Sequence, residues 1–179
     1  TKPGKDGAPV MGPDGVKDLL AWVKNGGCFM GFHSASDTFH TGPGETLSPY
    51  LEMVGAEFTG HGPQFKGVLK VVDPSHPAMV SLPETWAVME EWYAFDKYVK
   101  DKIHVLAILE PGEEGVKTKY PAYAKGAYPI IWCRAYGDGK VYFNGLGHNE
   151  AVWDDAAFQK SIVDAASWLL EDYPLASQL

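Results

Sequence analysis

Residues 28–37 read CFMGFHSASD, and this stretch decides the fold that we expect for the chain. The part from Cys28 to Phe32 is apolar or glycine throughout, and Gly26 and Gly27 precede it. A short run without polar alternation is typical of a strand buried on both faces, as in a parallel sheet. We therefore expect residues 28–32 to occupy an interior position in a mainly parallel α/β sheet.

A second stretch, residues 141–150 with the sequence VYFNGLGHNE, is built in the same way. His33 and His148 each follow an apolar, glycine-punctuated run. In an open α/β sheet the carboxyl ends of the strands border the ligand crevice. The sequence therefore predicts that both imidazoles open onto one pocket, which favours an enzyme, a metal site or a ligand site over a purely structural domain.

Composition limits the class of protein and the partners. The chain has 179 residues, 45% of them hydrophobic, which suits one globular domain; we find no repeat or linker. The net charge of −8 argues against nucleic acid, because phosphate binding needs a cationic surface. No stretch approaches the roughly 18 apolar residues of a membrane span. We expect a soluble protein of the cytoplasm or periplasm with neither nucleic acid nor membrane as partner.

The two cysteines, Cys28 and Cys133, lie inside apolar runs. Neither has the CxxC spacing of a redox or metal site, so we expect buried free thiols, and the compartment stays undecided.

Hydrophobic periodicity predicts the remaining elements. Asp14 could cap a first helix over 16–23, and the turn sequence Tyr136-Gly137-Asp138-Gly139 predicts a hairpin. Further helices are expected near 47–54 and over 154–171, strands over 65–72, 86–93, 103–109, 128–135 and 140–144, and a loop over 110–128.

Small polar residues follow both histidines. Ser34, Ser36 and Asp37 could cap a helix or hydrogen-bond a polar ligand. Asn149 and Glu150 follow His148, and Glu150 could orient that imidazole or cap the last helix. In both places the alternative is a buried, hydrogen-bonded histidine with a structural role.

Two further motifs add candidates. In Glu90-Glu91-Trp92-Tyr93 successive side chains of a strand point to opposite faces, so one carboxylate at most faces the pocket, and we expect it to be Glu91. The alternative is a solvated acidic edge. His61 lies between Gly60 and Gly62, which predicts a tight loop close to a ligand or a plain surface turn.

Three imidazoles and one carboxylate, from His33, His61, His148 and Glu91, could bind a divalent metal such as zinc. Their spacing matches neither HxH nor HExxH, so the sequence leaves the metal open.

The chain resembles the ThuA-like (trehalose utilisation) family. Matching pieces occur in the family's order over about residues 14–170: they are GGCFMGFHSA (26–35), GAEFTGH (55–61), His76-Pro77, EEWY (90–93) and YGDGKV (136–141) running on to Gly147-His148.

The resemblance implies a flavodoxin-like, class I glutamine amidotransferase-like three-layer sandwich. In those amidotransferases a cysteine nucleophile follows a central strand. Here the corresponding residues are His33-Ser34-Ala35, and Cys28 lies at the wrong end of the strand, so we do not expect a glutaminase. His148-Asn149-Glu150 resembles the later His-Pro-Glu of the amidotransferases.

The resemblance also implies use of trehalose or related disaccharides through 3-keto sugars. The leading expectation is a carbohydrate enzyme with catalytic His33, Glu91 and His148, working by acid–base chemistry with or without a metal. The residues expected to bind the sugar are Ser34, Ser36, Asp37, His61, Trp92, Asn149 and Glu150. The alternatives are a non-catalytic sugar-binding or sensing domain and a structural module on a degenerate amidotransferase fold.

The family usually has a strand-helix-strand segment ahead of the first helix found here, whereas residues 1–13 contain no strand-like run. We therefore expect a fold that is incomplete at its N-terminal end. The strand at 28–32 would then pair with a strand from another copy of the chain or from a longer polypeptide.

Overall fold

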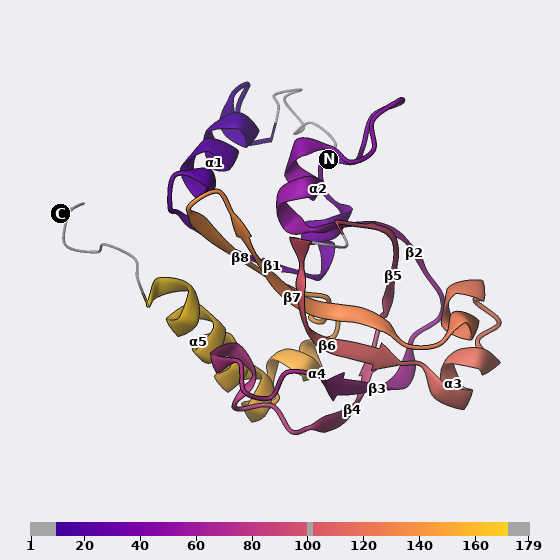
Figure 1. Ribbon diagram of the computed structural model, residues 1–179. Coiled ribbons are helices and arrows are strands. Elements are labelled where there is room, and N and C mark those ends of the chain that lie inside the picture. Colours follow the sequence, from indigo (N-terminus) through magenta and orange to yellow (C-terminus); the bar gives the residue numbers. More distant parts are fainter. Residues whose placement is uncertain (1–9, 100–101, 172–179) are drawn as a thin grey trace.

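The computed structural model describes residues 10–99 and 102–171, which form a mixed α/β fold (Figure 1). Its strands are β1 (Cys28–Phe32), β2 (Ala56–His61), β3 (Phe65–Val71), β4 (Thr85–Glu90), β5 (Tyr93–Tyr98), β6 (His104–Glu110), β7 (Tyr128–Tyr136) and β8 (Gly139–Asn144). Its α-helices are α1 (Gly15–Lys24), α2 (Pro49–Val54), α3 (Gly112–Lys117), α4 (Glu150–Trp153) and α5 (Ala156–Leu170).

Six strands form one sheet in the order β1-β8-β7-β6-β3-β4, and β2 and β5 pair separately as a two-stranded ribbon. Within the described residues the expectation of a mainly parallel sheet is wrong: β1 and β8 pair in parallel, and the other pairs of the sheet are antiparallel. The hairpin turn at Gly137-Asp138 explains one of them, since a short connection can only join antiparallel strands.

β1 lies at the edge of the described sheet, so the expected interior position is wrong there as well. The apolar run nevertheless has a clear cause. Phe29 packs in the cluster under α1 and α2, and Met30 in the cluster under α5. Helices therefore cover both faces of β1. The apolar sequence results from this burial by helices, and it does not show that a strand lies on each side of β1. A further strand beside β1 stays a prediction.

The same alternation continues in β8. Val141 and Phe143 are fully buried towards α1 and α2, whereas Tyr142 is fully buried in the cluster under α5. Figure 1 shows β1 and β8 lying between these two groups of helices. At this end of the sheet the molecule has three layers. The segments that carry His33 and His148 follow β1 and β8, the two strands of the middle layer.

Local signals at several element ends differ from expectation. The strand expected over 86–93 ends at Glu90, and the chain starts a new strand, β5, at Tyr93. The helix expected over 154–171 is confirmed as α5, and Asp155 caps it by accepting hydrogen bonds from the N–H groups of Ala157 and Phe158. The short helix α4, which precedes it, was not expected.

Two other expectations also need correction. The loop expected over 110–128 contains α3 and a 3-10 turn at Pro121–Lys125. Asp14 occupies the N-cap position of α1, but its side chain accepts no capping hydrogen bond. No helix in the described part of the chain combines the length and the apolarity needed to cross a membrane.

Candidate functional site

His33 is the first residue after β1 and opens the 3-10 turn His33–Asp37. Its φ of +40° is uncommon for a residue other than glycine, and such strained residues often cluster at functional sites. The main-chain carbonyl of His33 accepts a hydrogen bond from Ser36 Oγ, which helps to fix the turn. The buried imidazole lies against the Tyr93 ring, with 3.8 Å between the ring centroids.

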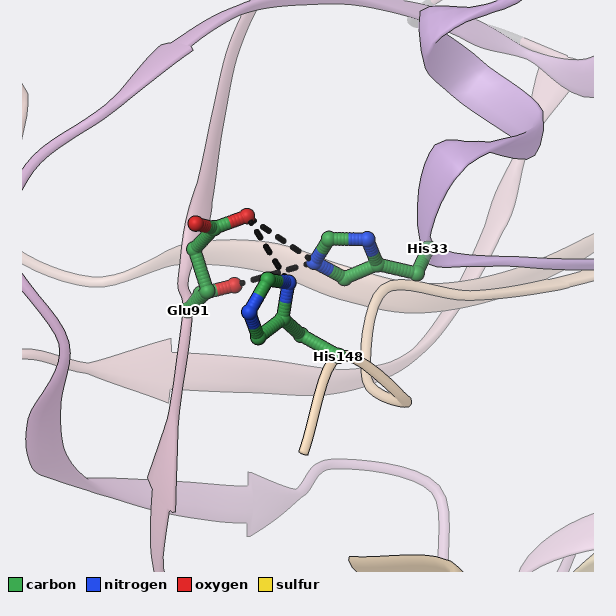
Figure 2. Close-up of side chains that lie close together, drawn as sticks. All are labelled: His33, Glu91 and His148. Atoms are coloured by element: carbon green, nitrogen blue, oxygen red, sulfur yellow. Dashed lines mark hydrogen bonds and ion pairs between the residues drawn. The ribbon is translucent and has the colours of Figure 1, made fainter. Parts of the chain in front are cut away.

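Glu91 lies between the end of β4 and the start of β5, and its carboxylate is surrounded by imidazoles. Oε2 is 3.7 Å from His33 Nε2 and 3.2 Å from His148 Nδ1. Oε1 is 3.3 Å from His61 Nδ1. Figure 2 shows His33 and His148 reaching Glu91 from two separate chain segments. The structure thus brings His33, His61, Glu91 and His148 together, and 5.3 Å separates the ring centroids of His33 and His148.

Glu90 stabilises the main chain around the cluster, and its side chain is fully buried. Oε2 accepts hydrogen bonds from the N–H groups of Gly147 (2.9 Å) and His148 (3.3 Å). Oε1 accepts from the N–H of Glu91 (2.8 Å) and from Asn149 Nδ2 (3.4 Å). One carboxylate therefore joins the segment that carries Glu91 to the loop that carries His148. Sequence reasoning placed Glu90 away from the pocket but missed this role.

His61 is the last residue of β2 and pairs with Tyr93 of β5, so the expected tight loop is wrong at this residue. Its side chain is 42% exposed, and its ring stacks on Tyr93 with 6.0 Å between centroids. Tyr93, which packs against both His33 and His61, was not expected at the site.

Burial lowers the pKa of His33, although the Glu91 carbonyl and carboxylate nearby act in the opposite direction. The imidazole is therefore neutral at pH 7 and keeps a lone pair on one nitrogen. Burial, together with the charges of Asp37, Glu91 and Glu90, raises the pKa of Tyr93, so its hydroxyl stays protonated. Burial also raises the pKa of Glu90, against the effect of the N–H groups that it accepts from.

Two residues expected to bind substrate lie in the core instead. Trp92 is fully buried and donates from Nε1 to the carbonyl of Phe65, and Ser36 is fully buried with its hydroxyl bound to His33. Neither side chain reaches solvent in this structure, and their contact with substrate stays a prediction. The polar atom of each side chain donates to a main-chain carbonyl, as a buried polar group requires a partner inside the protein.

The other expected binding residues surround the cluster without joining it. Asp37 Oδ1 lies 2.6 Å from His40 Nε2, and Ser34 is exposed. Asn149 Nδ2 donates to the carbonyl of Met89, 3.1 Å away. Glu150 is exposed at the start of α4, and the imidazole of His148 pairs with Glu91.

Both cysteines are free, as expected. Cys28 Sγ donates to the carbonyl of Leu169, and burial raises the pKa of Cys133 to about 12. Neither thiol belongs to the histidine cluster.

The cluster offers metal-binding atoms. One ligand atom each from His33, Glu91 and His148 lies within 4.8 Å of the other two. Two imidazoles and one carboxylate form a donor set that suits zinc and other divalent transition metals.

An aromatic cavity of about 310 Å³ lies elsewhere, against the β2–β5 ribbon. Tyr120, Phe95 and Tyr128 line it together with Thr59 and Lys125. None of the described residues of the histidine cluster lines this cavity, which is therefore a separate place on the molecule.

The fold and the site together describe an α/β protein with a polar, histidine-rich cluster at the ends of its strands. The chain belongs to the ThuA family, described as trehalose utilisation, because the family's sequence model matches residues 5–169. A comparison with curated protein sequences found no significant match.

Solved structures share the fold. A ThuA-like protein from Bacteroides uniformis matches with a TM-score of 0.69 and 19% identity, covering 92% of this chain and 67% of its own. A ThuA-like protein from Parabacteroides merdae matches with a TM-score of 0.69 and 18% identity, covering 90% of this chain and 66% of its own. The chain thus spans about two thirds of the length of these relatives. A β-galactosidase from Rahnella sp. R3 matches with a TM-score of 0.57 and 12% identity, covering 87% of this chain and 21% of its own.

Proposed function

We propose that this protein is an enzyme that acts on a disaccharide or keto-glycoside by proton transfer at the cluster of His33, Glu91 and His148. One observation carries the proposal: a nearly buried carboxylate, 13% exposed, is enclosed by imidazoles from three separate chain segments. Imidazoles exchange protons near neutral pH, and a carboxylate beside them supplies a base. Membership in a family described as trehalose utilisation supplies the substrate class.

The chemistry fits a sugar that carries a carbonyl group. Proton removal next to a carbonyl needs a base on the carbon side and an acid near the oxygen. Glu91 is the candidate base. His148 is the candidate acid, because its side chain is 40% exposed and can meet a substrate from solvent. The buried, neutral His33 completes the hydrogen-bonding arrangement around Glu91.

The amidotransferase reaction does not fit this site. A glutaminase of that class attacks with a cysteine. Here the thiol of Cys28 donates a hydrogen bond to the carbonyl of Leu169, and Cys133 is buried. The proposal is therefore limited to acid–base chemistry on a carbohydrate.

The test is turnover of a panel of disaccharides and their 3-keto derivatives, trehalose included, followed by NMR of the reaction mixture. We expect at least one keto-disaccharide to be converted. The Glu91→Gln variant should lose about 100-fold or more in rate, the usual contribution of a positioned acid–base group. Glu110→Gln is the matched control, because Glu110 pairs with Lys70 outside the site. Equal rates for the two variants would refute the assignment.

The second candidate is sugar binding without turnover, and the aromatic cavity favours it. Tyr120 and Tyr128 offer rings on which a sugar can stack. Binding of the unmodified disaccharide, abolished by Tyr120→Ala and unaffected by Glu91→Gln, with no product in the NMR assay, would support this candidate over the enzyme.

A further inference from the structure

We propose that the cluster binds one divalent transition-metal ion, Zn²⁺ being the best fit, through His33 Nε2, His148 Nδ1 and Glu91 Oε2. The inference rests on the proposed function, because it names the cofactor of the same site.

The spacing of the three atoms suits one small ion. Metal bonds of 2.0–2.2 Å in tetrahedral geometry place neighbouring ligand atoms about 3.3 Å apart. Glu91 Oε2 lies 3.2 Å from His148 Nδ1 and 3.7 Å from His33 Nε2, and all three ligand atoms lie within 4.8 Å of one another. Figure 2 shows both rings directing a nitrogen towards the same carboxylate oxygen. Binding requires only a small closure around the ion.

The charges also suit a cation. Within the described residues, the ion-pair partners of Glu91 are His33, His61 and His148, without a lysine or arginine. Two imidazoles and one carboxylate would leave one net positive charge at a bound divalent ion, which suits the polarisation of a carbonyl oxygen. Three protein ligands leave a fourth position open, as in catalytic zinc sites.

Supporting contacts hold the ligands in place. Glu90 fixes the backbone of both Glu91 and His148, and His61 contacts the Glu91 oxygen that faces away from the proposed ion. Such outer contacts orient ligands and tune the metal. His33 Nε2 also lies 3.3 Å from the Glu91 carbonyl oxygen, so the metal-bound form needs the ring proton on Nδ1. Glu91 Oε1 and His148 Nε2 are not among the proposed ligand atoms, so they would remain available for the proton transfer proposed above, and the ion would supply a Lewis acid for the carbonyl oxygen.

The test uses the purified chain, stripped of metal by a chelator and titrated with Zn²⁺ alone against a chromophoric competitor. We expect one ion per chain. His148→Ala and Glu91→Gln should each weaken binding by about 10-fold or more, since even outer contacts contribute 10- to 100-fold. His104→Ala is the matched control: His104 is exposed and pairs with Asp73 outside the cluster. His33→Ala is avoided because His33 is buried at a strained turn. Circular dichroism checks that each variant is folded.

Co²⁺ supplies a readout that does not depend on activity. A bound Co²⁺ should give a visible spectrum typical of nitrogen and oxygen ligands, and His148→Ala should reduce it. The proposal would be overturned by the absence of stoichiometric Zn²⁺ binding, by wild-type affinity in the Glu91→Gln and His148→Ala variants, or by a loss of affinity in His104→Ala as large as theirs. If Zn²⁺ fails to bind while a keto-sugar is still turned over through Glu91, the metal site falls and the proposed function stands. If Zn²⁺ binds at these residues without turnover of any sugar, the metal site stands and the proposed function falls.

Discussion

Two adjacent carboxylates at the site have opposite surroundings. The chain is extended at the end of β4, so the side chains of Glu90 and Glu91 leave it in different directions. Glu90 enters the core and accepts hydrogen bonds from main-chain N–H groups, whereas Glu91 faces the imidazoles. The first has the contacts of a positioning group, and the second those of a reacting group or metal ligand.

Substituting each of them with glutamine should separate the two roles. Glu90→Gln places an amide NH₂ against the N–H groups of Gly147 or Glu91, so we expect about 1–3 kcal/mol of lost stability. Glu91→Gln should cost less stability than Glu90→Gln, because the Glu91 side chain is partly exposed, and it should cost far more activity per folded molecule. Urea denaturation and initial rates measure both quantities. A Glu90→Gln variant of normal stability whose activity loss equals that of Glu91→Gln would contradict this division.

At the scale of elements, the carboxylate of Glu57 joins the segment after the His33 turn to the β2–β5 ribbon. Glu57 of β2 accepts hydrogen bonds from Thr41 N (3.1 Å) and Thr41 Oγ1 (2.8 Å). It also contacts His40 Nδ1 at 3.1 Å and Lys97 Nζ at 3.0 Å. Burial alone would raise the pKa of Glu57, but these contacts outweigh it and lower the pKa to about 2.

The contact predicts a loss of stability in acid. Because the folded pKa of Glu57 lies below its ordinary value of 4.5, its stabilising contribution is complete above about pH 4.5 and declines as the pH falls towards 2. Glu57→Gln should flatten the dependence of the unfolding free energy on pH in this window. Hydrogen bonds from Ser75 and His104 lower the pKa of Asp73 to about 2. Asp73 should therefore maintain part of the dependence of stability on pH in the Glu57→Gln variant. Urea denaturation at a series of pH values measures it. The same slope in Glu57→Gln as in the Glu110→Gln control would show that Glu57 is not responsible.

Across the whole molecule, the sequence predicted what depends on neighbours along the chain. The periodicity of α1 and α5 and the hairpin of β7 and β8 are of this kind. It could not predict the direction of strand pairing, because an apolar run such as β1 records burial by helices and not the identity of its partner strand.

The site divides in the same way. His33, Glu91 and His148 could be chosen because strand ends and strand alternation are local properties. The hydrogen bond from Gly147 to Glu90 and the packing of Tyr93 on His33 join residues far apart in the sequence, and no local sequence pattern predicts these contacts.

The last prediction concerns the two apolar clusters on opposite faces of the sheet. Adjacent residues of β8 belong to different clusters: Phe143 packs with Trp132 towards α1 and α2, and Tyr142 packs towards α5. A rigid strand shared by both cores should make them unfold together. Phe143→Ala should therefore lower the unfolding free energy by about 3–5 kcal/mol, and Leu169→Ala in α5 by about 2–5 kcal/mol. In each variant the far-UV circular dichroism and the tryptophan fluorescence should follow one coincident transition in urea. Two separated transitions, with Phe143→Ala shifting one and Leu169→Ala the other, would show that the faces are independent and that β8 does not couple the cores on either side of the site.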